Sequence, residues 1–202
     1  MDKKFKRIIS IFGLFLVFSY LAVVIIFVIA GSEIFLTIME IITIISAFYI
    51  LLLLETVLID SDMEHQIQKH FALISMAGCI ILTSSAHIVN LTVTRSLISR
   101  GVNVPIFFQI GQWPSVEMAL DYLAWGLFLG IAFICTAFTI KKNYETILKW
   151  TLLVCGCFCI IGFIGAMINF ANLWYIAVLG YTVGLAVICI EQIKLNRKRR
   201  VL

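Results

Sequence analysis

The chain has 202 residues, of which 62% are hydrophobic and 13% are charged, and its mean hydropathy is +1.10. Soluble proteins carry about 25% charged residues, so this composition cannot supply a surface that faces water on all sides. The formal net charge of +4 does not indicate nucleic-acid binding, because the basic residues stand at the ends of apolar runs, where they suit anionic lipid. The composition therefore predicts an integral membrane protein.

Six apolar runs are long enough to cross a membrane as helices. Such a helix needs ~20 residues, and these runs are continuously apolar, whereas membrane β-strands alternate apolar and polar residues. The first run is too long for the ~7–15-residue apolar core of a cleaved signal peptide. The sequence predicts an all-α bundle of six transmembrane helices in one domain, residues 1–202, with spans at 8–30, 35–59, 71–97, 117–140, 148–170 and 173–193.

The distribution of basic residues predicts the orientation of this bundle. With six spans, only Arg95 and Arg100 lie on the side away from the termini, out of 15 lysines and arginines. Basic segments resist translocation, so both termini are predicted to be cytoplasmic. The residues on the terminal side are Lys3, Lys4, Lys6, Arg7, Lys69, Lys141, Lys142, Lys149, Lys194, Arg197, Lys198, Arg199 and Arg200.

Small residues predict how the helices pack. In lipid, helices associate by close packing at glycine and other small residues. Our preferred interpretation is that the last three spans pack tightly together, and the alternative is a homodimer through the same faces. The small-residue pairs are Gly126 with Gly130, Gly162 with Ala166, and Gly180 with Gly184.

Ionisable and amide side chains within the apolar spans are the main functional signal. A charge at the centre of a membrane helix costs roughly 2.5–3.5 kcal/mol on insertion scales, so each should have a partner or a role. Counted along the predicted helices, most of these residues fall in one layer, in the outer half of the bundle. The candidate ligand-binding residues are Glu40, His87, Asn90, Glu117, Asp121, Trp125 and Asn169.

The spacing of these residues predicts two polar helix faces. His87 and Asn90 share one face with Thr83 and Thr94, and Asp121 shares another with its neighbours one turn away, Glu117 and Trp125. If the two faces oppose each other, they form a cleft with Trp125 as a wall and the connection around Pro105 as a roof. The structural alternatives are a simple interhelical hydrogen bond for His87 and a helix-start position for Glu117.

No metal or cofactor is predicted. A bis-histidine haem needs two membrane histidines at similar depth, and only His87 qualifies. A catalytic zinc ion would need a further ligand beyond His87 and the carboxylates. The six cysteines all lie in apolar stretches without metal-type spacing, which is typical of small packing residues.

Three stretches in the middle of the chain carry a resemblance. They are Ala86–Val93, Trp113–Val116 and Ala119–Gly126, and together they resemble the central block of an uncharacterised family of small bacterial polytopic membrane proteins. The resemblance implies a bacterial origin, and hence a multi-pass protein of the cytoplasmic membrane. It implies no activity.

The polar layer leads to three functional hypotheses. The first is a protein that binds or transports a small amphiphilic or lipid-like molecule within the bilayer. The second is a membrane enzyme in which His87 and Asp121 or Glu40 act as acid and base on a lipid or isoprenoid substrate, because histidine beside a carboxylate transfers protons near neutral pH. The third is a non-catalytic membrane partner, such as an immunity-type subunit.

Overall fold

The computed structural model describes residues 2–59, 63–140 and 145–198, and all the regular elements in these ranges are helical. Six of the helical segments are long and apolar enough to cross a membrane, which confirms the predicted six-helix bundle and a multi-pass membrane protein. These segments are Lys4–Ala30, Glu33–Leu58, Gln66–Ser99, Val116–Phe138, Thr146–Met167 and Trp174–Asn196. Of the basic residues that predict the orientation, Lys141, Lys142, Arg199 and Arg200 lie outside the described residues.

The spans are built from nine labelled α-helices among the described residues. The third span begins five residues before its predicted start, because polar residues such as Gln66 continue the helix beyond the part that hydropathy marks. The helices are α1 (Lys3–Ala30), α2 (Glu33–Leu58), α3 (Gln66–Val89), α4 (Arg95–Ser99), α5 (Val116–Tyr122), α6 (Leu129–Phe138), α7 (Thr146–Met167), α8 (Trp174–Tyr181) and α9 (Val183–Lys198).

Two spans contain a π-helical segment. Segment η2 (Asn90–Thr94) joins α3 to α4, and segment η4 (Leu123–Phe128) joins α5 to α6. A π-helical turn uses i→i+5 bonds and holds more residues than an α-helical turn, and such turns occur frequently at functional sites. The residues that follow each segment are therefore rotated about the helix axis relative to an unbroken α-helix.

The helices close into a ring. Along this ring α1 packs against α2, α2 against α3, α3 against α6, and α6 against α7. The last span completes it, because α8 packs against α7 and α9 packs against α1, with Thr182 between them in a non-ideal helical conformation. The sixth span thus crosses from one side of the bundle to the other.

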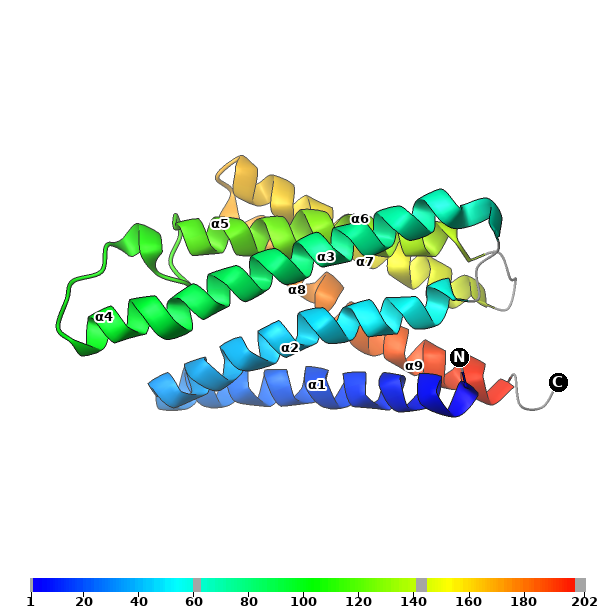
Figure 1. The fold of residues 1–202 in the computed structure, drawn as a ribbon, viewed down its shortest axis with the longest axis horizontal. Coiled ribbons are helices and arrows are strands. Elements are labelled where there is room, and N and C mark those ends of the chain that lie inside the picture. The colour runs from blue at the N-terminus through cyan, green and yellow to red at the C-terminus, as the bar shows by residue number, and fades with distance from the viewer. Residues whose placement is uncertain (1, 60–62, 141–144, 199–202) are drawn as a thin grey trace.

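The two ends of the bundle carry different connections. Figure 1 shows the start of α1 and the end of α9 at one end, here called the terminal end. The connection from Arg100 to Ser115 lies at the opposite end, here called the loop end, next to α4 and the start of α5. This arrangement agrees with the even number of crossings in the predicted topology.

The small-residue faces of the last three spans are used inside the chain. A Cβ atom added at Gly126 would lie 2.6 Å from the Cβ of Phe163 on α7, and one at Gly180 would lie 2.9 Å from the carbonyl oxygen of Cys155, also on α7. These glycines therefore let η4 and α8 approach the α7 backbone closely. Both glycines are in close contact within one chain, and the alternative of a homodimer through these faces stays a prediction.

Candidate functional site

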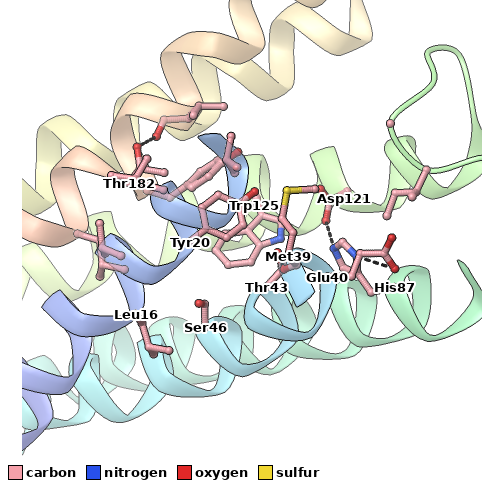
Figure 2. Close-up of a pocket in the computed structure, with 18 of the residues that line it drawn as sticks. Leu16, Tyr20, Met39, Glu40, Thr43, Ser46, His87, Asp121, Trp125 and Thr182 are labelled. Atoms are coloured by element: carbon pink, nitrogen blue, oxygen red, sulfur yellow. Dashed lines mark hydrogen bonds and ion pairs between the residues drawn. The ribbon is translucent and has the colours of Figure 1, made fainter. Parts of the chain in front are cut away.

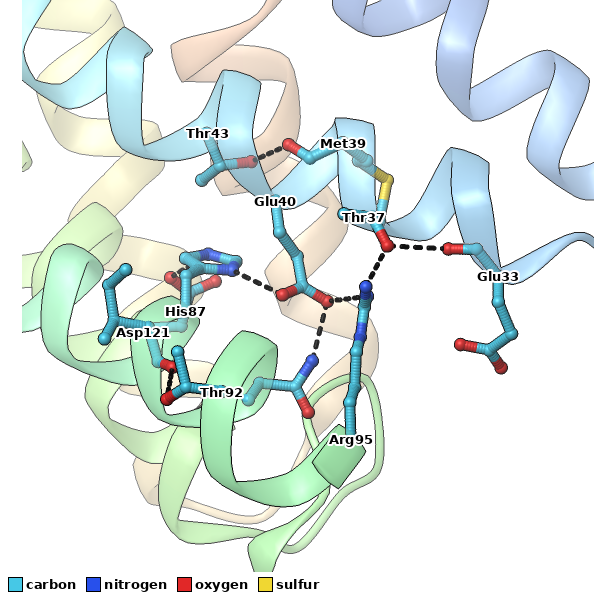
Figure 3. A network of polar contacts seen from close by, with 11 residues as sticks. Glu33, Thr37, Met39, Glu40, Thr43, His87, Thr92, Arg95 and Asp121 are labelled. Carbon is cyan, nitrogen blue, oxygen red and sulfur yellow. Dashed lines mark hydrogen bonds and ion pairs between the residues drawn. The ribbon is translucent and has the colours of Figure 1, made fainter. Parts of the chain in front are cut away.

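A buried carboxylate on α2 organises the polar contacts at the loop end. The Glu40 side chain is 1% exposed, and its Oε1 accepts hydrogen bonds from Asn90 Nδ2 at 2.7 Å and from Arg95 Nη2 at 2.9 Å. The other guanidinium nitrogen of Arg95, Nη1, donates to the hydroxyl of Thr37 on α2 (Figure 3). The charge of Glu40 is therefore neutralised by a cation that approaches from the third span.

The π-helical segment η2 explains why Asn90 and Arg95 reach the same carboxylate oxygen. In an α-helix, at ~100° per residue, a side chain five positions on points ~140° away. In a π-helical turn, residue i+5 returns close to the direction of residue i. The backbone N–H of Arg95 bonds the carbonyl oxygen of Asn90, which is the i→i+5 bond of such a turn. The widened turn thus places both donors beside Glu40.

His87 lies between two carboxylates from different helices. Its Nδ1 is 4.0 Å from Glu40 Oε2, and its Nε2 is 3.6 Å from Asp121 Oδ1 on α5. All four atoms are buried and none has a hydrogen-bond partner among the described residues. The separations exceed the ~2.7–3.2 Å of a good hydrogen bond, so these groups can still bind another polar atom.

A cavity of about 370 Å³ opens beside this histidine (Figure 2). Glu40, His87 and Asp121 form its polar wall at the loop end. Hydroxyl groups of Thr43, Ser46 and Thr182 add scattered polar atoms, and aliphatic side chains make up much of the remaining wall, including Leu16, Val17, Ile50 and Leu185. The cavity is therefore polar at one end and mainly apolar along its length.

Aromatic side chains form a further wall of the cavity. The rings of Trp125 and Tyr181 lie 5.1 Å apart and those of Trp174 and Tyr181 lie 6.0 Å apart, with their planes tilted by 48° and 51°. These three side chains and Tyr20 on α1 line the cavity. The buried Nε1 of Trp125 has no hydrogen-bond partner among the described residues, so it is a further free donor.

The structure brings together most of the residues that the sequence singled out. Glu40, His87, Asp121 and Trp125 line the cavity. Asn90 does not line it but donates a hydrogen bond to Glu40. Their common depth, predicted from helix counting, is thus matched by direct contact between α2, α3 and α5. Their role in binding a ligand stays a prediction.

Glu117 and Asn169 lie outside this cavity. Glu117 is buried in the first turn of α5 but does not line the cavity. Asn169 is exposed, and its Oδ1 accepts a hydrogen bond from Trp113 Nε1 at 3.2 Å. With φ of 57°, Asn169 adopts the left-handed conformation that commonly follows a helix, so its place is explained by the end of α7.

The connection at the loop end covers the cavity with a different part than predicted. Pro105 is exposed and does not line the cavity, whereas Ile110 and Gly111 do. Gly111 has φ of 80°, which favours glycine and turns the chain at this point. The connection around Pro105 thus contributes to the cavity wall as predicted, but through Ile110 and Gly111 and not through Pro105 itself.

Sequence reasoning missed four residues of the site. Arg95 was interpreted only as a basic residue on the side away from the termini, and the π-helical turn that directs it toward Glu40 has no signature in apolar spacing. Trp174 and Tyr181 are seven positions apart, which places them on one helix face and was an available signal. Tyr20 also carried an available signal, because it is a lone tyrosine in the first apolar span.

The site does not resemble a metal centre. Across residues 2–59, 63–140 and 145–198, no group of three histidine, cysteine, aspartate or glutamate side chains is arranged to hold a metal ion. The two carboxylates beside His87 instead approach opposite ring nitrogens.

Comparison with protein-family models, with curated proteins and with solved structures finds no match to this chain. The resemblance of the central block therefore supplies no family assignment, and any function must be argued from the geometry of the cavity.

Proposed function

We propose that this protein binds or transports a small amphiphilic or lipid-like molecule within the membrane. The observation that carries this proposal is the cavity of about 370 Å³ with Glu40, His87 and Asp121 gathered at one end. This volume falls within the ~300–1,000 Å³ of typical small-molecule sites, which are mainly apolar with a few convergent polar groups. An amphiphile fits such a site because its polar head binds the polar end of the cavity and its apolar body packs against the apolar walls.

The unpaired polar atoms support a ligand at the loop end. Glu40 Oε2, Asp121 Oδ1 and Trp125 Nε1 are buried without hydrogen-bond partners among the described residues. A buried polar group without a partner costs about 1–3 kcal/mol, so a ligand that supplies the missing donor or acceptor gains that free energy on binding.

The helix arrangement supports entry from the lipid. Both α1 and α8 line the cavity, yet the main helix contacts of α1 are to α2 and α9, and those of α8 are to α7. Leu21 of α1 lines the cavity and is 40% exposed. A ligand that is dissolved in the bilayer can therefore approach between α1 and α8.

The charge distribution and the resemblance support a location for this activity. The terminal end carries most of the basic residues, so it is assigned to the cytoplasmic side, and the polar end of the cavity then lies in the outer leaflet. The resemblance of the central block to bacterial proteins makes the bacterial cytoplasmic membrane the proposed location.

The proposal is tested by filling the cavity. Ser46 lines the cavity on α2, and Ser46→Phe adds an aromatic ring there, so we expect this variant to lower the affinity for N-phenyl-1-naphthylamine at least about tenfold. This neutral probe carries one N–H donor on an apolar body. Its fluorescence is titrated with the protein in phosphatidylcholine nanodiscs, with empty nanodiscs as the blank.

The matched control is Ser85→Phe on α3. Ser85 is exposed and does not line the cavity, so the same substitution should leave the affinity unchanged. Equal affinities of Ser46→Phe and the unmodified protein, with both variants folded, would show that the probe does not use this cavity and would overturn the proposal.

The distance of 3.6 Å between His87 Nε2 and Asp121 Oδ1 favours one second candidate, an enzyme. In that case His87 and Asp121 act as acid and base on a lipid or isoprenoid substrate. The enzyme predicts a changed lipid species, detected by mass spectrometry of membranes from expressing cells, that disappears in His87→Ala. Identical lipid profiles for the unmodified protein and for cells without it would reject this candidate.

A further inference from the structure

The charges that line the cavity are unbalanced. Its described lining contains two carboxylates, Glu40 and Asp121, and no lysine or arginine. Arg95 neutralises Glu40 from outside the cavity, through a bond of 2.9 Å. Among the described residues, Asp121 has no lysine or arginine in an ion pair with it, and its neighbour at 3.6 Å, His87, is charged only when protonated.

Asp121 can therefore supply a negative charge to whatever occupies the cavity. Its side chain is 18% exposed and its Oδ1 has no hydrogen-bond partner among the described residues. An anionic head group would meet two carboxylates here and is disfavoured. A cationic head group would neutralise Asp121 in a water-poor setting, where an ion pair is stronger than in bulk water.

The aromatic wall suits the same kind of head group. Trp125, Trp174 and Tyr181 line the cavity together with Asp121, and their tilted rings are not stacked face to face. The face of an aromatic ring attracts a cation, and aromatic side chains grouped around one volume are a recurring way to bind methylated ammonium groups. The polar and the aromatic walls thus select the same chemistry.

We propose that the ligand of this cavity is a lipophilic organic cation, an amine or quaternary ammonium compound. Its head lies between Asp121 and the rings of Trp125 and Tyr181. Its apolar body extends along the cavity toward Ile50. Ile50 is ten residues from Glu40 on α2, which corresponds to ~15 Å of helix. This inference rests on the proposed function, since it needs the cavity to be a ligand site.

The test compares two probes of the same shape that differ in charge. The cation is 4-butyl-N,N,N-trimethylanilinium, and its neutral isostere is 1-butyl-4-tert-butylbenzene, in which carbon replaces the charged nitrogen. Each displaces N-phenyl-1-naphthylamine from the full chain in nanodiscs of zwitterionic phosphatidylcholine, so that lipid charge does not concentrate the cation. We expect the cation to displace the probe at a concentration at least about tenfold below that of its isostere.

Asp121→Asn should remove this preference while it keeps the binding of the neutral isostere. The matched control is Glu33→Gln, which removes an exposed carboxylate on α2 outside the cavity and should keep the full preference. A second pair tests the aromatic wall without changing charge. Trp125→Leu should lower the preference at least about threefold, and Trp150→Leu, at an exposed tryptophan outside the cavity, should not.

The outcomes separate this inference from the function on which it rests. Equal displacement by both probes, with the neutral probe still sensitive to Ser46→Phe, overturns the cationic ligand and leaves the cavity as a binding site. An unchanged preference for the cation over its isostere in Asp121→Asn also overturns the cationic ligand. If Asp121→Asn does not fold, an unchanged preference in Trp125→Leu overturns it instead. Insensitivity of the neutral probe to Ser46→Phe overturns the proposed function itself.

Discussion

Arg95→Met is expected to lower the free energy of unfolding by about 3–5 kcal/mol. Glu40 is 1% exposed, and the guanidinium of Arg95 is the cation that neutralises it, at 2.9 Å. Methionine keeps most of the apolar stem but removes the charge, which leaves a buried carboxylate without a counter-ion. The measurement is the midpoint of thermal unfolding in detergent micelles, followed by intrinsic fluorescence, together with chemical unfolding for the free energy.

The matched control for this substitution is Arg100→Met. Arg100 is exposed at the end of α4, so its replacement should change stability by no more than about 0.5 kcal/mol. The double variant Glu40→Gln with Arg95→Met should recover much of the loss, because a neutral amide no longer needs the cation. Full stability of Arg95→Met alone would contradict the ion pair. A double variant as unstable as the single one would assign the loss to packing of the arginine stem.

Gly156→Val is expected to lower the free energy of unfolding by about 1–3 kcal/mol. A Cβ atom at Gly156 would lie 2.8 Å from the carbonyl oxygen of Gly130 and 2.6 Å from a side-chain carbon of Ile134, so α6 and α7 would have to separate. The backbone oxygen cannot move aside as a flexible side chain could. The same unfolding experiments measure the effect.

Cys157→Val is the matched control for Gly156→Val. Cys157 is the next residue on α7 and is exposed, so a valine there meets lipid and should leave stability nearly unchanged. Separation of α6 from α7 should also disturb η4, which packs against α7 and carries Trp125, so Gly156→Val is further expected to weaken binding of the neutral probe. A Gly156→Val variant as stable as Cys157→Val would show that the two helices are not in close contact.

The number of crossings and the depth of the polar residues were predictable from the sequence. Both depend on distance along a helix, which is proportional to residue number at ~1.5 Å per residue. Glu40, His87 and Asp121 could therefore be assigned to one layer before any contact was known. The same calculation placed Asn169 in this layer. The chain turns at the end of α7, however, and directs Asn169 toward Trp113 and away from the cavity.

The tertiary structure decided which side chains meet within that layer. The rotation of a side chain about its helix axis depends on local backbone geometry, and the π-helical turn after Val89 changes it for Arg95. The helix is likewise interrupted at Thr182, which separates α8 from α9. Trp174 and Tyr181, which line the cavity, lie on α8 before this interruption.

The chain by itself thus determined an all-α membrane bundle of six crossings, because the hydrocarbon layer sets a length and a polarity that a linear sequence must satisfy. It did not determine the partner of Glu40 or the walls of the cavity, because these depend on the angles at which separate helices face one another. Those angles result from close packing of neighbouring helices at residues such as Gly126 and Gly156. The helices that meet at these glycines come together only when the chain folds.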